Sequence, residues 1–142
     1  MFNELISLVG KVFDPVILFE IFHIQVDDVK IVDGRGYLTI KDLGVSLIYN
    51  ADKRLEAVQF LSMHDGNADY SGGFLNGLHW RDRRDVVRQK LSGFLSSQES
   101  VDLPVLGRSL AWDKFLIGGL VFAVQYADPD IFVRLTVSYP DA

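Results

Sequence analysis

The stretch "GLVFAVQYADPDIFVRLTVSY", residues 119–139, decides the fold. In its second half an apolar row alternates with other residues, and this row comprises Ile131, Val133, Leu135, Val137 and Tyr139. A period of two is typical of a β-strand with one buried face. The turn residues "DPD" at 128–130 separate this run from a similar one at 120–127. The segment therefore predicts an antiparallel hairpin near the C-terminus.

More strands are expected upstream of this hairpin. Short runs rich in β-branched and aromatic residues, each bounded by Gly, Asp or Asn, are "VKIV", "YLTI", "VSLIYN" and "LEAVQFLSMH", and "SLAWDKFLI" follows later. The stretch "YNADKRLEAVQF" predicts a hairpin that turns at Asn50–Lys53. We expect a twisted, mostly antiparallel sheet of about five or six strands.

Three segments carry helix signals. "NELISLVG" predicts a short helix with Asn3 as its cap and Gly10 as its stop. "DPVILFEIFHI" has a helix start at Asp14 and Pro15, although a strand competes with this reading. "RDRRDVVRQKLSGF" predicts a central helix, capped by Asp82.

The segment "SGFLSSQESVDLPVLGRSLAW", which follows the central helix, is expected to be a long loop. The sequence thus predicts an α+β fold, with two N-terminal helices, one central helix and an antiparallel sheet. No linker or repeat divides the chain, so we expect residues 1–142 to form a single domain.

Composition limits the classes of function. The 142 residues are 49% hydrophobic and contain no cysteine, which excludes disulfides and thiolate sites. The net charge of −5 disfavours nucleic acid as a partner and favours a protein with a basic surface. The N-terminus lacks the pattern of a leader, and no apolar run is long enough to span a bilayer. We therefore expect a cytoplasmic protein without a membrane partner.

The segment "HDGNADYSGG", residues 64–73, places Asp65, Asn67 and Asp69 at alternate positions, as in a calcium loop. Such a loop also needs Gly at its sixth position and Glu at its twelfth. Tyr70 and Asn76 stand at these two places, so a connector between strands is the better interpretation.

Other chemical motifs are weak. The three histidines lack the short spacing of zinc ligands, and no nucleophile elbow "GxSxG" is present. We expect no metal, no cofactor and no catalytic residue. The basic run "WRDRRDVVRQK" is interpreted as the solvated face of the central helix, with an anion-binding patch as the alternative.

Several segments together resemble a known family. From Gly44 onward the order is a strand hairpin, a Tyr-Gly connector, a "GL" step, an Arg-containing helix, "AWDKF" and a closing hairpin. This pattern resembles that of small bacterial candidate immunity proteins of polymorphic toxin systems. The positions that carry the resemblance are Gly44, Phe60, Tyr70, Gly72, Gly77, Leu78, Arg83, Val86, Leu91, Trp112, Asp113, Tyr126 and Val137.

The resemblance implies a non-catalytic protein that binds and neutralises a cognate bacterial toxin. Occlusion and charge complementarity would supply the mechanism, with aromatic anchors. The residues expected to bind the partner are Asp65, Asp69, Tyr70, Trp112, Asp113, Asp128 and Asp130. The alternatives are a small-ligand-binding or regulatory module with a cleft over the sheet and, third, an enzyme of unrecognised type.

Overall fold

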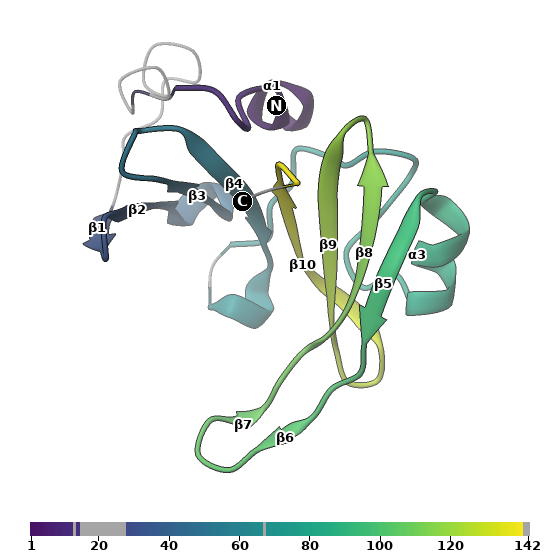
Figure 1. Ribbon diagram of the computed structural model, residues 1–142. Coiled ribbons are helices and arrows are strands. Elements are labelled where there is room, and N and C mark those ends of the chain that lie inside the picture. The colour runs from purple at the N-terminus through teal and green to yellow at the C-terminus, as the bar shows by residue number, and fades with distance from the viewer. Residues whose placement is uncertain (13, 15–27, 67, 141–142) are drawn as a thin grey trace.

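Antiparallel strand pairing organises the molecule (Figure 1). A computed structural model describes residues 1–12, 14, 28–66 and 68–140 of the chain. Within these residues the main sheet has eight strands in the order β1-β2-β3-β4-β10-β9-β8-β5. Their bounds are β1 Asp28–Val32, β2 Arg35–Ile40, β3 Val45–Tyr49, β4 Leu55–Leu61, β5 Phe94–Gln98, β8 Ala111–Ile117, β9 Leu120–Ala127 and β10 Ile131–Ser138. A separate two-stranded ribbon consists of β6 Asp102–Leu103 and β7 Gly107–Arg108.

The α+β class is confirmed, but the expected number of strands is too low. Part of the difference comes from the segment 92–112, which was expected to be a loop and contains β5, β6 and β7. Every residue of these three strands is exposed, so no alternation of buried and exposed residues marks them in the sequence. Hydrogen bonds to neighbouring strands hold them instead: β5 pairs with β8, and β6 pairs with β7.

Two α-helices lie in the described residues, α1 Phe2–Ser7 and α3 Arg84–Lys90. Both were expected, but neither has the expected cap: α1 begins after Met1 and contains Asn3, and α3 begins after Arg83. Apart from Asp14, the helix expected over "DPVILFEIFHI" lies outside the described residues. Short 3₁₀ turns occupy Lys41–Leu43 (η1) and Met63–Asp65 (η2).

The two expected hairpins are present. β3 and β4 join through a turn in which the Lys53 amide donates to the Asn50 carbonyl. β9 and β10 pair as expected, except for a bulge between Phe132 and Arg134. The bulge shifts the inward row of β10, so Phe132 and Val133 are both buried and Ile131 is only half-buried.

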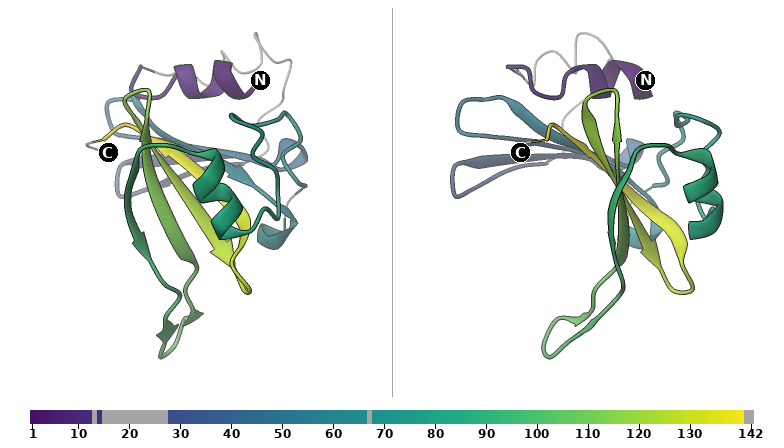
Figure 2. Two further views of the ribbon diagram at one scale, coloured as in Figure 1. Left: turned by 90° about the vertical axis from the view of Figure 1, so that its right-hand side faces the viewer. Right: turned by 45° about the vertical axis from the view of Figure 1, so that its right-hand side comes forward.

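One face of the sheet carries the hydrophobic core. Phe60 on β4 lies 4.8 Å from Phe2 of α1 and 4.7 Å from Tyr70 in the loop that follows η2, measured between ring centroids. Phe132 on β10 stacks on Trp80 at 4.6 Å. Helix α1, the loop residues 68–83 and helix α3 therefore cover the same face of the sheet, as the two views in Figure 2 show for the helices.

The other face is mixed, since a polar row lies beside a row that contains Tyr37 and Ile48. The register aligns Ser46 on β3, Gln59 on β4 and Thr136 on β10 across the sheet. The Gln59 amide nitrogen lies 3.4 Å from the Thr136 hydroxyl, so this row forms hydrogen bonds across the strands.

Candidate functional site

A two-stranded arm projects from the main sheet, and we define it as residues 99–110 (Figures 1 and 2). Its register pairs Asp102 with Arg108 and Leu103 with Gly107. Nearer the sheet, the Ser109 amide donates to the Val101 carbonyl at 2.8 Å. Side chains add to this ladder, since the Ser100 hydroxyl donates to the Ser109 carbonyl. The arm is therefore a hydrogen-bonded ribbon.

The tip of the arm is apolar and open to solvent. Val105 is 92% exposed and Leu106 is 84% exposed, and Leu103 is also exposed. Two adjacent aliphatic side chains at this exposure add no hydrophobic free energy to the isolated fold, because the hydrophobic effect acts only on apolar area removed from water. Exposed apolar groups that lie together mark interaction sites.

A buried carboxylate anchors the base of the arm. Asp113 on β8 is completely buried, and its oxygens accept from Arg84, Arg88 and Tyr126. The nitrogen–oxygen distances are 2.9 Å to Arg84 Nη2 and 2.8 Å to Arg88 Nη2, and the Tyr126 hydroxyl lies at 2.9 Å. These charge-assisted hydrogen bonds offset the free-energy cost of removing the Asp113 carboxylate from water.

The sequence of α3 explains the two cations. Arg84 and Arg88 are four residues apart on a helix, so both side chains reach the same side. Val87 and Leu91 are buried and hold that side of the helix against the sheet. The guanidinium of Arg84 also lies over the Tyr126 ring, 5.1 Å from its centroid.

The cluster changes the pKa values of its members. Burial alone raises the pKa of the Asp113 carboxyl, but hydrogen bonds from Arg88, Arg84 and Tyr126 outweigh it, and the pKa falls below its usual value. Burial and the negative charge of Asp113 raise the pKa of the Tyr126 hydroxyl. Asp113 is thus charged and Tyr126 neutral at ordinary pH.

Arg84 links this cluster to the arm. Its Nη1 lies 3.0 Å from Glu99, the first residue of the arm, and 3.7 Å from Asp130 in the β9–β10 turn. Its Nη2 donates to the Gln98 carbonyl at the end of β5. At the other end of β5, the Arg88 guanidinium lies over the Phe94 ring. Helix α3 therefore holds β5 at both ends.

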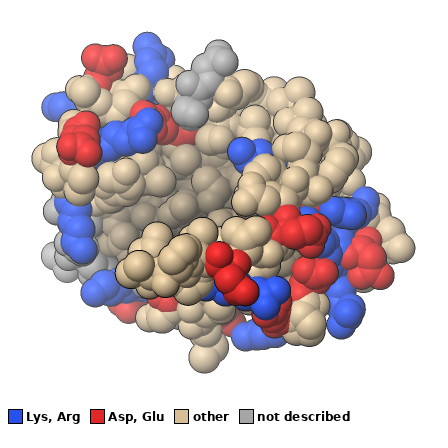
Figure 3. Space-filling model, turned by 60° about the horizontal axis from the view of Figure 1, so that its bottom comes forward, with Lys and Arg blue, Asp and Glu red and all other residues tan. Residues whose placement is uncertain are grey.

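Acidic side chains surround the base of the arm. Glu99, Asp128 and Asp130 are exposed there, and Arg108 lies 3.6 Å from Asp128. Together with Arg83 and Ser100, these residues line a shallow cavity of about 460 Å³. In Figure 3, which brings the arm side of the molecule forward, acidic and basic side chains border a hollow of mostly uncharged residues.

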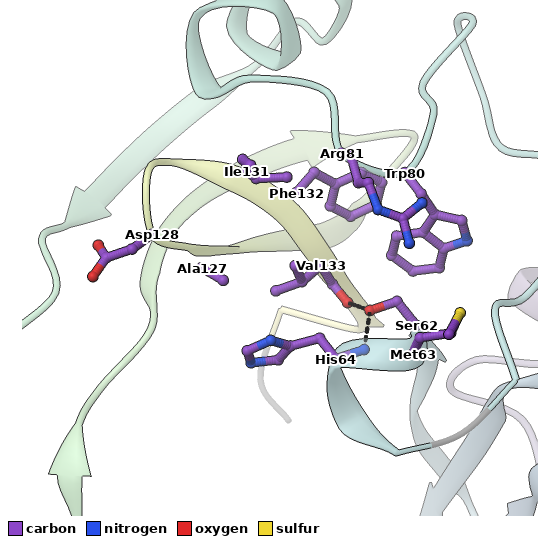
Figure 4. A pocket seen from close by; sticks show the side chains of 10 residues that line it. All are labelled: Ser62, Met63, His64, Trp80, Arg81, Ala127, Asp128, Ile131, Phe132 and Val133. Atoms are coloured by element: carbon purple, nitrogen blue, oxygen red, sulfur yellow. Dashed lines mark hydrogen bonds between the residues drawn. The ribbon is translucent and has the colours of Figure 1, made fainter.

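A second cavity of about 380 Å³ lies beside the β9–β10 turn (Figure 4). Its walls come from η2, from the loop before α3 and from β10, and the residues that line it include His64, Trp80, Arg81, Asp128 and Phe132. The Ser62 hydroxyl bridges two walls, since it donates to the Val133 carbonyl and accepts from the His64 amide. An aromatic ring and ionisable groups therefore face one open space.

The structure separates the predicted site residues into two groups. Asp128 and Asp130 are exposed beside the arm, and Trp112 is half-buried with the Lys114 ammonium over its ring. Asp113 and Tyr70 are buried, so neither side chain can touch a partner on the surface of this fold. Both are corrections to the expectation. Asp113 balances two arginines, and Tyr70 packs on Phe60 in the core.

Asp65 and Asp69 serve the loop in which they lie. Asp65 forms an ion pair with Arg134 of β10, and an oxygen of Asp69 accepts from the Met63 amide at 2.7 Å. Asp69 also lies 3.7 Å from Arg81. These contacts point the two carboxylates at different partners, which supports the connector interpretation of "HDGNADYSGG".

Sequence reasoning missed the most prominent features of this site. The arm tip lies in "DLPVLG", an apolar run inside a segment expected to be a polar loop. This run was the available signal, because three aliphatic residues in a polar loop have no core to enter. No signal distinguished Arg84 from Arg81 and Arg83, since only the folded helix shows which arginine faces Asp113.

Comparisons with protein families, curated proteins and solved structures found no match to this chain. The resemblance to immunity proteins therefore stays a prediction. In the part of the chain that the structure describes, no helix has the length and apolar character needed to span a bilayer.

Proposed function

We propose that this chain is a non-catalytic, cytoplasmic protein-binding domain, an immunity protein that binds and neutralises a cognate bacterial toxin with a basic surface. The exposed arm tip, with Val105 and Leu106, carries the proposal. Apolar side chains presented in this way contribute free energy only when a second surface covers them.

Charge at the base of the arm supports a basic partner. Three carboxylates are exposed there: Glu99, Asp128 and Asp130. Arg108 pairs with Asp128. Arg84 contacts Glu99 and Asp130, but its charge is already balanced by the buried Asp113. The whole chain carries a net charge of −5. Complementary charge accelerates encounter and selects among partners.

A growth assay tests this proposal. The reading frame beside the gene of this protein is expressed from an inducible promoter, with and without the full-length protein. We expect arrest of growth without the protein, rescue with it, and a complex that purifies at low salt. Normal growth of cells that express the neighbouring frame alone would refute the proposal.

A small-ligand-binding module is the second candidate, and the cavity in Figure 4 favours it. Its volume of about 380 Å³ is in the range that holds small molecules, and the indole of Trp80 offers a stacking surface. A saturable rise in melting temperature with one metabolite from a panel, abolished by Trp80→Ala and retained in Trp112→Ala, would favour this candidate.

A further inference from the structure

We infer that the tip of the arm enters an apolar recess on the partner protein, while the carboxylates at the base of the arm meet basic side chains at the rim of that recess. This inference rests on the proposed function and adds the element that makes the contact. The recess would be the concave surface that the partner uses for its own substrate.

The shape of the arm is the first argument. Four to five extended residues separate the sheet from the tip, so the arm reaches roughly 15 Å from its base at about 3.3 Å per residue. A narrow convex ribbon buries most of its surface only in a concave site. Substrate sites of enzymes are concave and mostly apolar, which matches the tip.

The rigidity of the base is the second argument. The Arg84 guanidinium contacts both Glu99 and Asp130, and the Gln98 carbonyl accepts from the same group. Hydrogen bonds between Ser100, Val101 and Ser109 continue this bracing into the arm. A braced arm loses less conformational entropy on binding than a free loop does.

The order of chemical groups along the arm is the third argument. Aliphatic side chains lie at the tip, and acidic side chains lie at the base. A binding surface with a dry centre and a charged rim has the same order. Here the rim carries the carboxylates of Glu99, Asp102, Asp128 and Asp130 and the exposed arginines Arg83 and Arg108. Carboxylates outnumber the exposed arginines, so the facing rim on the partner should carry Lys and Arg.

The experiment uses the double variant Val105→Ser/Leu106→Ser in the full chain. The matched control is Ile31→Ser/Val32→Ser, because these aliphatic residues are 74% and 54% exposed at the β1 edge, in another part of the sheet. Circular dichroism checks that both variants fold. Affinity for the toxin of the growth assay is then measured by calorimetry.

We expect the arm variant to bind at least about 100-fold more weakly and to lose protection, and the control to bind within about three-fold of the wild type. We also expect the wild-type protein to compete with the toxin's substrate. Binding by the arm variant equal to that of the wild type would overturn the inference and leave the proposed function intact. A wild-type protein that neither binds nor protects would instead remove the proposed function itself.

Two other occupants of the arm tip are outcomes of the same set of measurements. Sedimentation of the free protein shows whether the tip joins two copies of this chain, in which case the arm variant would turn a dimer into a monomer. Flotation with phosphatidylglycerol vesicles shows whether the tip enters a lipid surface. Either result, lost in the arm variant and kept in the control, would overturn the inference.

Discussion

Arg84 Nη2 lies 2.9 Å from Oδ1 of Asp113, and this ion pair is covered by helix α3 on one side and by the sheet on the other. The same guanidinium extends to Glu99, where the arm begins. Arg84 thus contacts both the buried Asp113 and the first residue of the arm. Changes at Asp113 should therefore affect stability and partner binding together.

Replacing Asp113 with Ala should destabilise the fold by about 3–5 kcal/mol, because two arginines lose a buried counter-charge. Urea unfolding measures the loss. The control is Asp128→Ala, since Asp128 is exposed and its pairing with Arg108 is loose. Equal effects of the two substitutions would contradict the role assigned to the buried cluster.

The stability of the fold should fall in acid through Asp113. Its pKa is lower in the folded chain than its ordinary value of 3.8, so the unfolded chain binds more protons between the two values. The contribution is fully present above the ordinary pKa and is lost as the pH falls through the folded pKa. Urea midpoints from about pH 6 to about pH 2 measure this slope.

The variant Asp113→Asn supplies the comparison for the acid series. It lacks this titration, so its stability should depend less on pH below the ordinary pKa of 3.8 than that of the wild type. Parallel curves for the two proteins would show that other carboxylates govern the acid limb.

Replacing Tyr70 with Phe should stabilise the protein by about 1 kcal/mol, because the buried Tyr70 hydroxyl has no hydrogen-bond partner in the described structure. Burial, with the charge of Glu4, also raises the pKa of Tyr70 to about 12. The wild type should therefore lose stability as the pH rises above 10.0, the ordinary value, and Tyr70→Phe should lose less.

Tyr126→Phe is the matched control for this prediction. The Tyr126 hydroxyl donates to Asp113 at 2.9 Å, so its removal should destabilise by about 1.5–3 kcal/mol. Thermal melts of the two variants at neutral pH should move in opposite directions.

Gly93→Ala should loosen β5 and the base of the arm. Gly93 has a φ of +79°, and a Cβ there would overlap the Leu116 carbonyl oxygen. Gly73→Ala is the control, because Gly73 has a φ of +81° and open space around it. We expect Gly93→Ala to lower the free energy of unfolding by at least about 1 kcal/mol more than Gly73→Ala does. Hydrogen exchange should also become faster at the Leu116 amide, which donates to the Gly93 carbonyl.

Asp128→Asn/Asp130→Asn should slow association with the basic partner several-fold at low salt, because these exposed carboxylates lie beside the arm. Asp33→Asn/Asp52→Asn changes the charge equally at distant turns and should have a smaller effect. Stopped-flow mixing at about 20 mM and about 200 mM salt separates the two variants, since salt screens this steering. Rates that do not respond to salt would argue against a basic partner.

Alternation in the sequence predicted the strands that have one buried face. β9, β10 and the β3–β4 hairpin follow from apolar rows and from turn residues such as Asn50. The bulge at Phe132 was beyond this reasoning, because both Phe132 and Val133 are apolar and either one could point inward. The local pattern therefore located these strands and left open the register of β10 against β9.

The candidate site was harder to predict, because its members come together only through pairing across the chain. Asp113 and Arg84 are far apart in the sequence, and the run "RDRRD" offers several equivalent cations. The buried partner of Arg84 is therefore a property of the tertiary fold. Asp128 and Asp130 were expected to bind a partner, and the structure places both in the exposed β9–β10 turn, where polar residues face water.

The bulge at Leu95 in β5 has a consequence for storage at high concentration. Its register shifts between Phe94 and Ser96, and β5 is an outer strand of the sheet. An irregular outer strand is a poor template for fibril growth, because an incoming chain cannot pair with it continuously. The protein can thus expose the apolar tip of the arm to solvent while its outer strand β5 resists the strand-by-strand addition that builds amyloid.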